Sequence, residues 1–259
     1  MLDSLYISAT GMQAQQLSVD TISNNLANVN TAAYKRSRVG FEDLLYRELA
    51  RTGPLLGGEA AGRYGSGVAV SGTVKAFADG DLRKTDAPLD VAIRGTGFFE
   101  VLLPDGSRAF TRSGALQVNR EGTLVTAEGH VIMPALQVPA DATAIAIDST
   151  GSINATVPGE TRPVEVGRLE LARFVNPAGL SAVGGNLYLA TEKSGDAIAG
   201  KPGEEGFGTL AQGFLESSNV KLVDELVALV LAQRAFEVNA RAVQASDELL
   251  SQINNLRRA

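Results

Sequence analysis

Large apolar residues recur at every seventh position near the start of the chain. The row consists of Leu5, Met12, Val19 and Leu26, and Ile22 extends it in a neighbouring turn. A seven-residue period is typical of a helix that packs against another helix, although a helix lying on the core of its own domain can share it. We predict a helix over residues 1–35 whose apolar stripe needs a partner.

The C-terminal part of the chain shows the same period over a longer stretch. No Gly or Pro interrupts the sequence after Gly213, and Asp224 and Glu225 lie early, where the helix dipole favours negative charge. Ser217, Ser218 or Asn219 could cap its start. We predict a helix over residues 214–259, with an apolar row made of Leu222, Leu229, Phe236, Val243 and Leu250, and Leu226 beside it.

Between the two predicted helices the period changes. Short runs rich in Val, Ile, Leu and Phe alternate with turns that contain Gly or Pro, and no helical period separates them. Such a pattern predicts an all-β sandwich or barrel, here over residues 81–213. The runs cover residues 90–103, 108–113, 115–119, 123–127, 130–134, 143–148, 164–175 and 186–191.

Glycine-rich stretches flank this β region. Residues 53–67, GPLLGGEAAGRYGSG, have six glycines and no clear period, so we predict an extended connector over residues 36–80. Residues 193–208 are expected to form the matching return. The pattern as a whole predicts an α+β fold: paired N- and C-terminal helices of coiled-coil type, an inserted all-β domain and an extended connector.

The segment Thr21–Arg36, TISNNLANVNTAAYKR, is rich in amides. It contains four Asn and carries no charge between Asp20 and Lys35. An exposed helix face normally uses charged side chains to stay solvated. We therefore interpret this face as a dry contact with further copies of the chain, across which the amides form hydrogen bonds.

Composition and charge narrow the range of partners. The 259 residues are 44% apolar, which is enough for a sizeable core and one to two domains. A net charge of -6 argues against a nucleic-acid partner, and the absence of Cys excludes disulfides and thiol nucleophiles. The start of the chain lacks the pattern of a cleaved signal peptide, and the apolar run Leu226–Ala232 is too short to span a bilayer. We expect no membrane insertion.

Candidates for catalysis or metal binding are few. His130 is the only histidine, and we interpret it as a strand-end side chain, because one His without Cys cannot build the usual zinc site. The stretch Asp79–Asp86 lacks the ligand order of a calcium loop and is interpreted as a solvated turn. We expect no catalytic residue, no metal and no cofactor. The main alternative of another class is a secreted cell-wall hydrolase, which would need two carboxylates flanking a cleft.

Several segments resemble the bacterial flagellar rod and hook family. Ser23–Arg36 resembles its N-terminal motif, and Val223–Leu250 resembles its C-terminal motif. Phe41–Tyr46, Asp90–Gly114 and Gly122–Pro134 resemble its middle part. The matches occur in order over nearly the whole chain and favour a distal rod member, with a proximal rod or hook protein as the alternative.

The resemblance implies a structural protein without catalysis, whose terminal helices form an inner tube inside the β domains. It implies a helical homopolymer that spans the periplasm, transmits torque and contacts proximal rod proteins, the hook protein and the basal-body rings. It also implies passage through the flagellar export apparatus without a cleaved signal peptide. The family usually has Gly before an aromatic residue where this chain has Ala33 before Tyr34, so we expect a different turn there. The candidate self-assembly residues are Leu5, Met12, Val19, Ile22, Asn24, Asn25, Leu26, Asn28, Leu222, Leu226, Leu229, Phe236, Val243 and Leu250.

Overall fold

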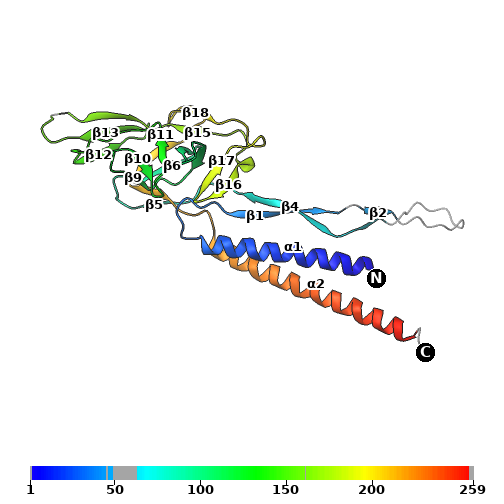
Figure 1. Cartoon of the computed structure of the whole chain (residues 1–259). Helices are drawn as coiled ribbons and strands as arrows, with labels where there is room; N and C mark the ends of the chain where they lie inside the picture. The colour runs from blue at the N-terminus through cyan, green and yellow to red at the C-terminus, as the bar shows by residue number, and fades with distance from the viewer. Residues whose placement is uncertain (1, 45, 49–62, 161, 257–259) are drawn as a thin grey trace. The chain divides into compact units, whose positions relative to one another are not determined.

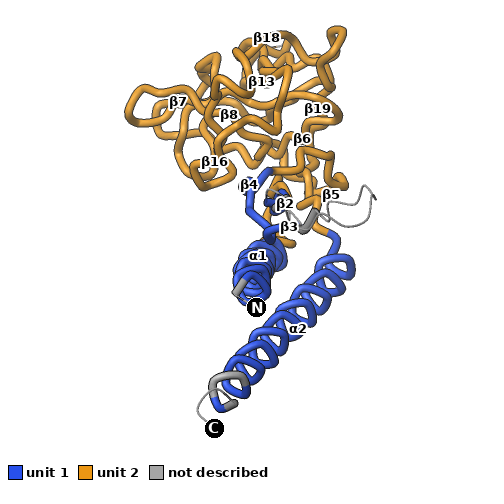
Figure 2. The backbone as a smooth tube through the Cα atoms, turned by 90° about the vertical axis from the view of Figure 1, so that its right-hand side faces the viewer, with its two compact units in different colours: residues 1–27, 37–74, 221–259 blue, residues 28–36, 75–220 orange. Residues whose placement is uncertain are grey.

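The chain has an α+β fold, with one helix near each end and a β-rich middle (Figure 1). The computed structural model describes residues 2–44, 46–48, 63–160 and 162–256. Two compact units are distinguished in Figure 2. Unit 1 contains residues 1–27, 37–74 and 221–259, and unit 2 contains residues 28–36 and 75–220.

Unit 1 is built on two antiparallel helices, α1 (Leu2–Ala27) and α2 (Leu222–Leu256) (Figure 1). The hydroxyls of Ser4 and Ser246 lie 3.4 Å apart near one end of the pair. Near the other end, the Asn25 amide donates to the Glu225 carboxylate at 3.1 Å. The first expectation, a helix at each end of the chain, is therefore confirmed.

The helix α1 ends earlier than the sequence pattern suggested. After Ala27 the chain turns, with the N–H of Thr31 donating to the carbonyl of Asn28, and Ala33 has a left-handed backbone with φ 58°. The cause lies in Asn25, whose side chain accepts from the N–H of Ser37 and donates to its carbonyl, both at 2.9 Å. These two bonds hold Ser37 beside α1, so residues 28–36 form a loop instead of a continued helix.

The helix α2 begins later than expected, at Leu222, because the preceding residues bond elsewhere. Residues Phe214–Glu216 form strand β20, and the Asn219 amide donates to the carbonyls of Ala76 and Ala78. The expected early carboxylates do lie in the first turn of α2.

Strands also occur in the part of unit 1 where a connector was expected. Strand β1 (Ser37–Asp43) pairs with β4 (Val68–Lys75), and β2 (Tyr46–Glu48) pairs antiparallel with β3 (Arg63–Gly65). Residues 53–62 of the glycine-rich stretch lie outside the described residues. Its remaining residues, 63–67, begin with β3.

Unit 2 is built from antiparallel strands. Its largest sheet has the order β16-β17-β8-β7-β11-β10-β9. The strands of this sheet are β7 (Phe99–Leu102), β8 (Arg108–Thr111), β9 (Leu116–Val118), β10 (Leu124–Thr126), β11 (Val131–Met133), β16 (Ser181–Gly184) and β17 (Leu187–Leu189).

Smaller sheets complete unit 2. A three-stranded sheet contains β12 (Ala144–Ile147), β13 (Ser152–Thr156) and β14 (Val164–Arg168). Three further pairs join β6 (Val91–Arg94) to β19 (Thr209–Gln212), β5 (Leu82–Lys84) to β20 (Phe214–Glu216), and β15 (Leu171–Arg173) to β18 (Ile198–Gly200). A short 3-10 helix, η1, covers Pro177–Gly179.

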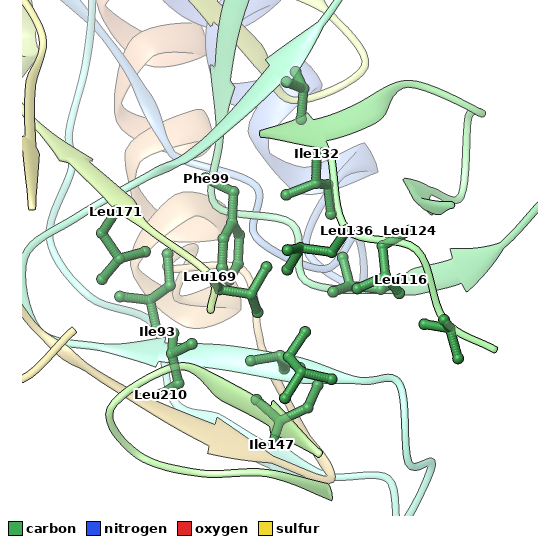
Figure 3. Close-up of a cluster of buried hydrophobic side chains, with 14 of the residues drawn as sticks. Ile93, Phe99, Leu116, Leu124, Ile132, Leu136, Ile147, Leu169, Leu171 and Leu210 are labelled. Atoms are coloured by element: carbon green, nitrogen blue, oxygen red, sulfur yellow. The ribbon is translucent and has the colours of Figure 1, made fainter. Parts of the chain in front are cut away.

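The core of unit 2 collects the apolar side chains of these strands, as Figure 3 shows. Phe99, Leu124, Ile132 and Leu169 are completely buried. Burial of such side chains contributes about 1.5–3 kcal/mol each, which is what holds short strands together. Every apolar run predicted as a strand contains one, so the expectation of a β-rich middle is confirmed.

Two stretches of unit 2 contain strands that the sequence interpretation did not include. The stretch Asp79–Asp86 is not wholly a solvated turn, because residues 82–84 form β5 and pair with β20. Residues 193–208, predicted as the return connector, contain β18, and Phe207 packs against the core. Both stretches have too few apolar residues to show a strand pattern, and their structure depends on partners far away in the sequence.

Candidate functional site

Small and polar residues at seven-residue spacing make several of the contacts between α1 and α2. In α1 these residues include Ser4, Gly11 and Asn25, and in α2 their counterparts are Ser246, Asn239 and Glu225. A Cβ at Gly11 would lie 3.0 Å from the Asn239 amide nitrogen. Gly in a helix interior costs about 1 kcal/mol relative to Ala, and here it permits the close approach of the two helices. The sequence pattern had suggested apolar rows for this contact.

The predicted assembly residues are distributed around this contact rather than on one surface. Ile22 and Asn25 are buried, and Asn24 is exposed. Three residues of α2 are exposed, namely Leu222, Leu226 and Phe236. The remaining residues are half-buried: Leu5, Met12, Val19, Leu26, Asn28, Leu229, Val243 and Leu250.

The start of α2 exposes an unusual amount of apolar surface. Its most exposed residues are Val223 at 69%, Leu231 at 64% and Val227 at 55%. A helix that is apolar on all sides is typical of a fully buried position. We call this surface the apolar band, and it consists of Leu222, Val223, Leu226, Val227, Val230 and Leu231.

The apolar band ends at Leu231, and charged side chains are more frequent after it. Further along α2, Arg234 and Glu237 form an exposed ion pair with a distance of 2.9 Å. The seven-residue row drew attention to Leu222 and Leu226 but missed the other four members of the band. The signal that could have found them is the run LVDELVALVL itself, in which only Asp224 and Glu225 are charged.

Other parts of unit 1 add exposed apolar side chains. In the sheet of β1 and β4, Phe41, Val70 and Val74 are exposed, and α1 exposes Tyr6 and Ile7. A two-stranded sheet is marginally stable by itself in water. This sheet, like the apolar band, therefore needs further apolar contacts to be stable.

Two amides of the amide-rich segment form hydrogen bonds within unit 1 or in the turn that follows α1. The Asn25 side chain is 1% exposed, and its amide is bonded inside unit 1 to Ser37 and to the buried Glu225. Asn28 accepts a bond from the hydroxyl of Thr31 in the turn after α1. In the single chain, at least these two amides serve to redirect the backbone after α1.

Unit 2 contains a buried ion network that the sequence did not reveal. Glu216 accepts from the Lys35 ammonium at 2.6 Å and from the Arg112 Nε at 2.8 Å. The side chains of all three residues are at most 3% exposed. Arg112 also reaches Asp79, whose side chain is 56% exposed, at 3.1 Å. The four residues of the network are at least 33 positions apart in the sequence, so no local motif connects them.

The network lies in a poorly solvated environment. Burial lowers the pKa of Lys35 below its ordinary value of 10.5, and the nearby Arg112 charge adds to this effect, while Glu216 opposes it. Burial also raises the pKa of the neighbouring Tyr188 phenol, with smaller contributions from Tyr34 and Glu216. The Arg112 guanidinium lies 5.9 Å from the centre of the Phe98 ring. The single carboxylate of Glu216 thus holds two cations in a largely apolar surrounding.

No catalytic or metal-binding arrangement is apparent in the described part of the chain. His130 directly precedes β11, as expected of a strand-end residue, and its Nε2 lies 3.7 Å from Glu128. Within residues 2–44, 46–48, 63–160 and 162–256, no group of three or more His, Asp or Glu side chains could hold a metal ion. Over the same residues, neither α1 nor α2 combines the length and apolarity that crossing a membrane requires.

Three family models match different parts of the chain. The model described as "Flagella basal body rod protein" matches residues 5–35, which contain most of α1 and of the loop after it. The model "Flagellar hook protein FlgE/F/G D1 domain" matches residues 92–155 in unit 2. The model "Flagellar basal body rod FlgEFG protein C-terminal" matches residues 211–256, which contain β20 and α2.

Similar proteins cover the whole chain. The flagellar basal-body rod protein FlgG of Borreliella burgdorferi is 42% identical over 269 residues, which include 100% of both chains. The protein of the same name from Caulobacter vibrioides is 42% identical over 99% of this chain and 100% of its own length. The flagellar hook protein FlgE of Helicobacter pylori is 39% identical, but over only 59% of this chain and 23% of its own length. The chain therefore belongs to the flagellar basal-body rod and hook protein family.

Proposed function

We propose that this chain is a structural subunit of the flagellar distal rod, which assembles with copies of itself into the shaft of the basal body. Relatives named as basal-body rod proteins match it from end to end, whereas the hook protein matches only part of it. This difference in coverage favours a rod subunit over a hook subunit.

The observation that carries the self-assembly proposal is the apolar band of α2. Within unit 1, α1 covers the opposite side of α2 and leaves these six residues exposed. A fully buried Val or Leu contributes about 1.5–3 kcal/mol, so covering the band would stabilise an assembly by several kcal/mol per copy. The surface chemistry favours an apolar partner, and another copy of the chain supplies one in its own helices and in the sheet of β1 and β4.

The terminal helices are proposed to form the inner tube of the shaft. In this arrangement α1 and α2 pair in the manner of a coiled coil, and half-buried residues such as Leu229 and Val243 complete their contacts on neighbouring copies. The predicted assembly residues keep this role in the proposal, with Asn25 acting indirectly by holding Ser37. The part of unit 1 between the helices is proposed to lie between subunits, because Phe41, Val70 and Val74 are exposed on it.

The remaining partners follow from family membership. We propose contacts with proximal rod proteins, the hook protein and the basal-body rings, and delivery by the flagellar export apparatus without a cleaved signal peptide. The proposal includes no catalysis. A wall-hydrolase role gains no support from Asp79 and Glu216, because both carboxylates bind Arg112 and Glu216 is buried.

The test uses a strain that lacks this protein and counts hooks on isolated basal bodies by electron microscopy. The unchanged chain should restore hooks, and Val230→Asp in the apolar band should not. Gln244→Asp is the matched control, because it places the same charge on an exposed, already polar position of α2 and should restore hooks. Full hook formation by Val230→Asp, or failure of the unchanged chain, would contradict the proposal.

A further inference from the structure

Unit 2 is connected to unit 1 through a small set of chain segments. The chain passes from one unit to the other after residues 27, 36, 74 and 220. The parts of unit 2 next to these points are residues 28–36, residues 75–81 and residues 214–220. Any force carried along the backbone from one unit to the other must pass through these three segments.

Glu216 bonds to the first two of these segments from the third. Its carboxylate accepts from the Lys35 ammonium at 2.6 Å and from the Gly80 N–H at 2.8 Å. Its backbone carbonyl accepts from the N–H of Ala33 at 2.8 Å. The buried Arg112 binds the other carboxylate oxygen and so fixes the orientation of the side chain.

Asn219 repeats this connection three residues later. Its Oδ1 accepts from the N–H of Arg36 at 2.7 Å. Its Nδ2 donates to the carbonyl of Ala76 at 2.7 Å and to that of Ala78 at 3.0 Å. The N–H of Ala76 donates directly to the carbonyl of Arg36 at 2.8 Å, so the three segments form a closed set of bonds.

These bonds replace a sheet, which the first segment lacks. Residues 28–36 form turns and irregular backbone without any strand, so no ladder of backbone bonds holds them in unit 2. Single backbone bonds to Glu216, Asn219 and Ala76 hold them, together with side-chain bonds to Glu216 and Asn219. The Asn186 amide adds one bond to the carbonyl of Ala32. Hydrogen bonds in a network of this kind strengthen one another, so the loss of one member weakens the others.

We propose that Glu216 and Asn219 form a clamp that fastens the three connecting segments to one another, so that they resist load together instead of peeling out of unit 2 one at a time. The load-bearing role rests on the proposed function as a shaft subunit. The clamp itself is a property of the single chain and can be tested without any assembly.

Amide hydrogen exchange of the purified full-length chain tests the clamp. Asn219→Ala removes three side-chain bonds and should accelerate exchange of the Arg36 and Ala76 amides by about tenfold or more. The amide of Val101 in the core should exchange as before. Asn176→Ala is the matched control, because the exposed Asn176 amide donates to Lys193 elsewhere in unit 2 and its loss should leave Arg36 and Ala76 unchanged. Unchanged exchange at Arg36 and Ala76 in Asn219→Ala would overturn the clamp.

The load-bearing role is tested with the same variant in the strain that lacks this protein. Cells with Asn219→Ala should form hooks in normal number but lose swimming in medium thickened with methylcellulose, where torque is high. Swimming equal to that of the unchanged chain in thickened medium would overturn the role under load. If the unchanged chain restored no hooks, the proposed function would fail, whereas the exchange result would still decide on the clamp.

Discussion

Replacing Glu216 by Gln would remove the one fully buried negative charge of the ion network while keeping the shape of the side chain. Lys35 and Arg112, each at most 3% exposed, would then lie in the interior with only Asp79 as a counter-charge at the surface. Replacing Lys35 by Met instead would leave Arg112 and Glu216 as a balanced pair. Each substitution removes one member of the ion pair between Lys35 and Glu216. Glu216→Gln leaves two buried cations, whereas Lys35→Met leaves one buried cation and one buried carboxylate.

The expected magnitudes follow from the cost of an uncompensated buried charge. Removing one partner of a buried pair typically costs about 3–5 kcal/mol, which is a large fraction of the stability of most domains. Glu216→Gln should therefore lower the melting temperature of unit 2 by roughly 6–20 °C. Lys35→Met should cost about 1 kcal/mol or less, because the Ala78 carbonyl keeps its bond from Asn219 and because the interior loses a surplus cation.

The assay is differential scanning calorimetry of the purified full-length proteins, since the chain has no Trp for fluorescence. The double variant should be more stable than Glu216→Gln alone, because removing Lys35 relieves part of the unbalanced charge. Equal and small effects of both single substitutions, or a larger effect of Lys35→Met, would refute the reasoning.

Three further predictions concern the helices and the titration of Lys35. Phe236→Asp places a carboxylate at a position of α2 that is 38% exposed; unit 2 should melt normally while hooks are absent, and a collapsed melt would contradict this. Gly11→Leu should separate α1 from α2 and make both sensitive to limited proteolysis, whereas Gly11→Ala should be tolerated. Because burial lowers the pKa of Lys35, the unfolded chain binds its proton more tightly, so the free energy of unfolding should rise as pH increases toward 10.5. Lys35→Met should lack this part of the rise in alkaline urea melts.

The sequence predicted the terminal helices and most strands because their signals are local. Heptad spacing marked α1 and α2, and apolar runs between Gly and Pro turns marked strands such as β7 and β8. The residues at which the helices end and begin were harder to predict from the sequence. The end of α1 depends on the Asn25 amide, which bonds to Ser37 twelve positions later. The start of α2 depends on the Asn219 amide, which bonds to Ala76 far away in the sequence.

The candidate site was predicted only in part. Large apolar residues at seven-residue spacing suggested a helix contact. They did not indicate that Ser4, Gly11 and Asn25 take part in it, where small side chains allow a closer approach. The ion network could not be predicted, because Lys35 and Glu216 are separated by 181 positions and each looks like an ordinary charged residue in the sequence. Only folding brings the loop that contains Lys35 against strand β20, which contains Glu216.

Cryo-electron microscopy of the assembled rod would test the central claim most directly. The measurement is the exposed fraction of the apolar band, with Val223, Val227 and Leu231 as its most exposed members in the single chain. The proposed assembly requires these side chains to lose most of their exposure against neighbouring copies of the chain. A rod in which they stay exposed to solvent, while other surfaces make the contacts between copies, would contradict the account.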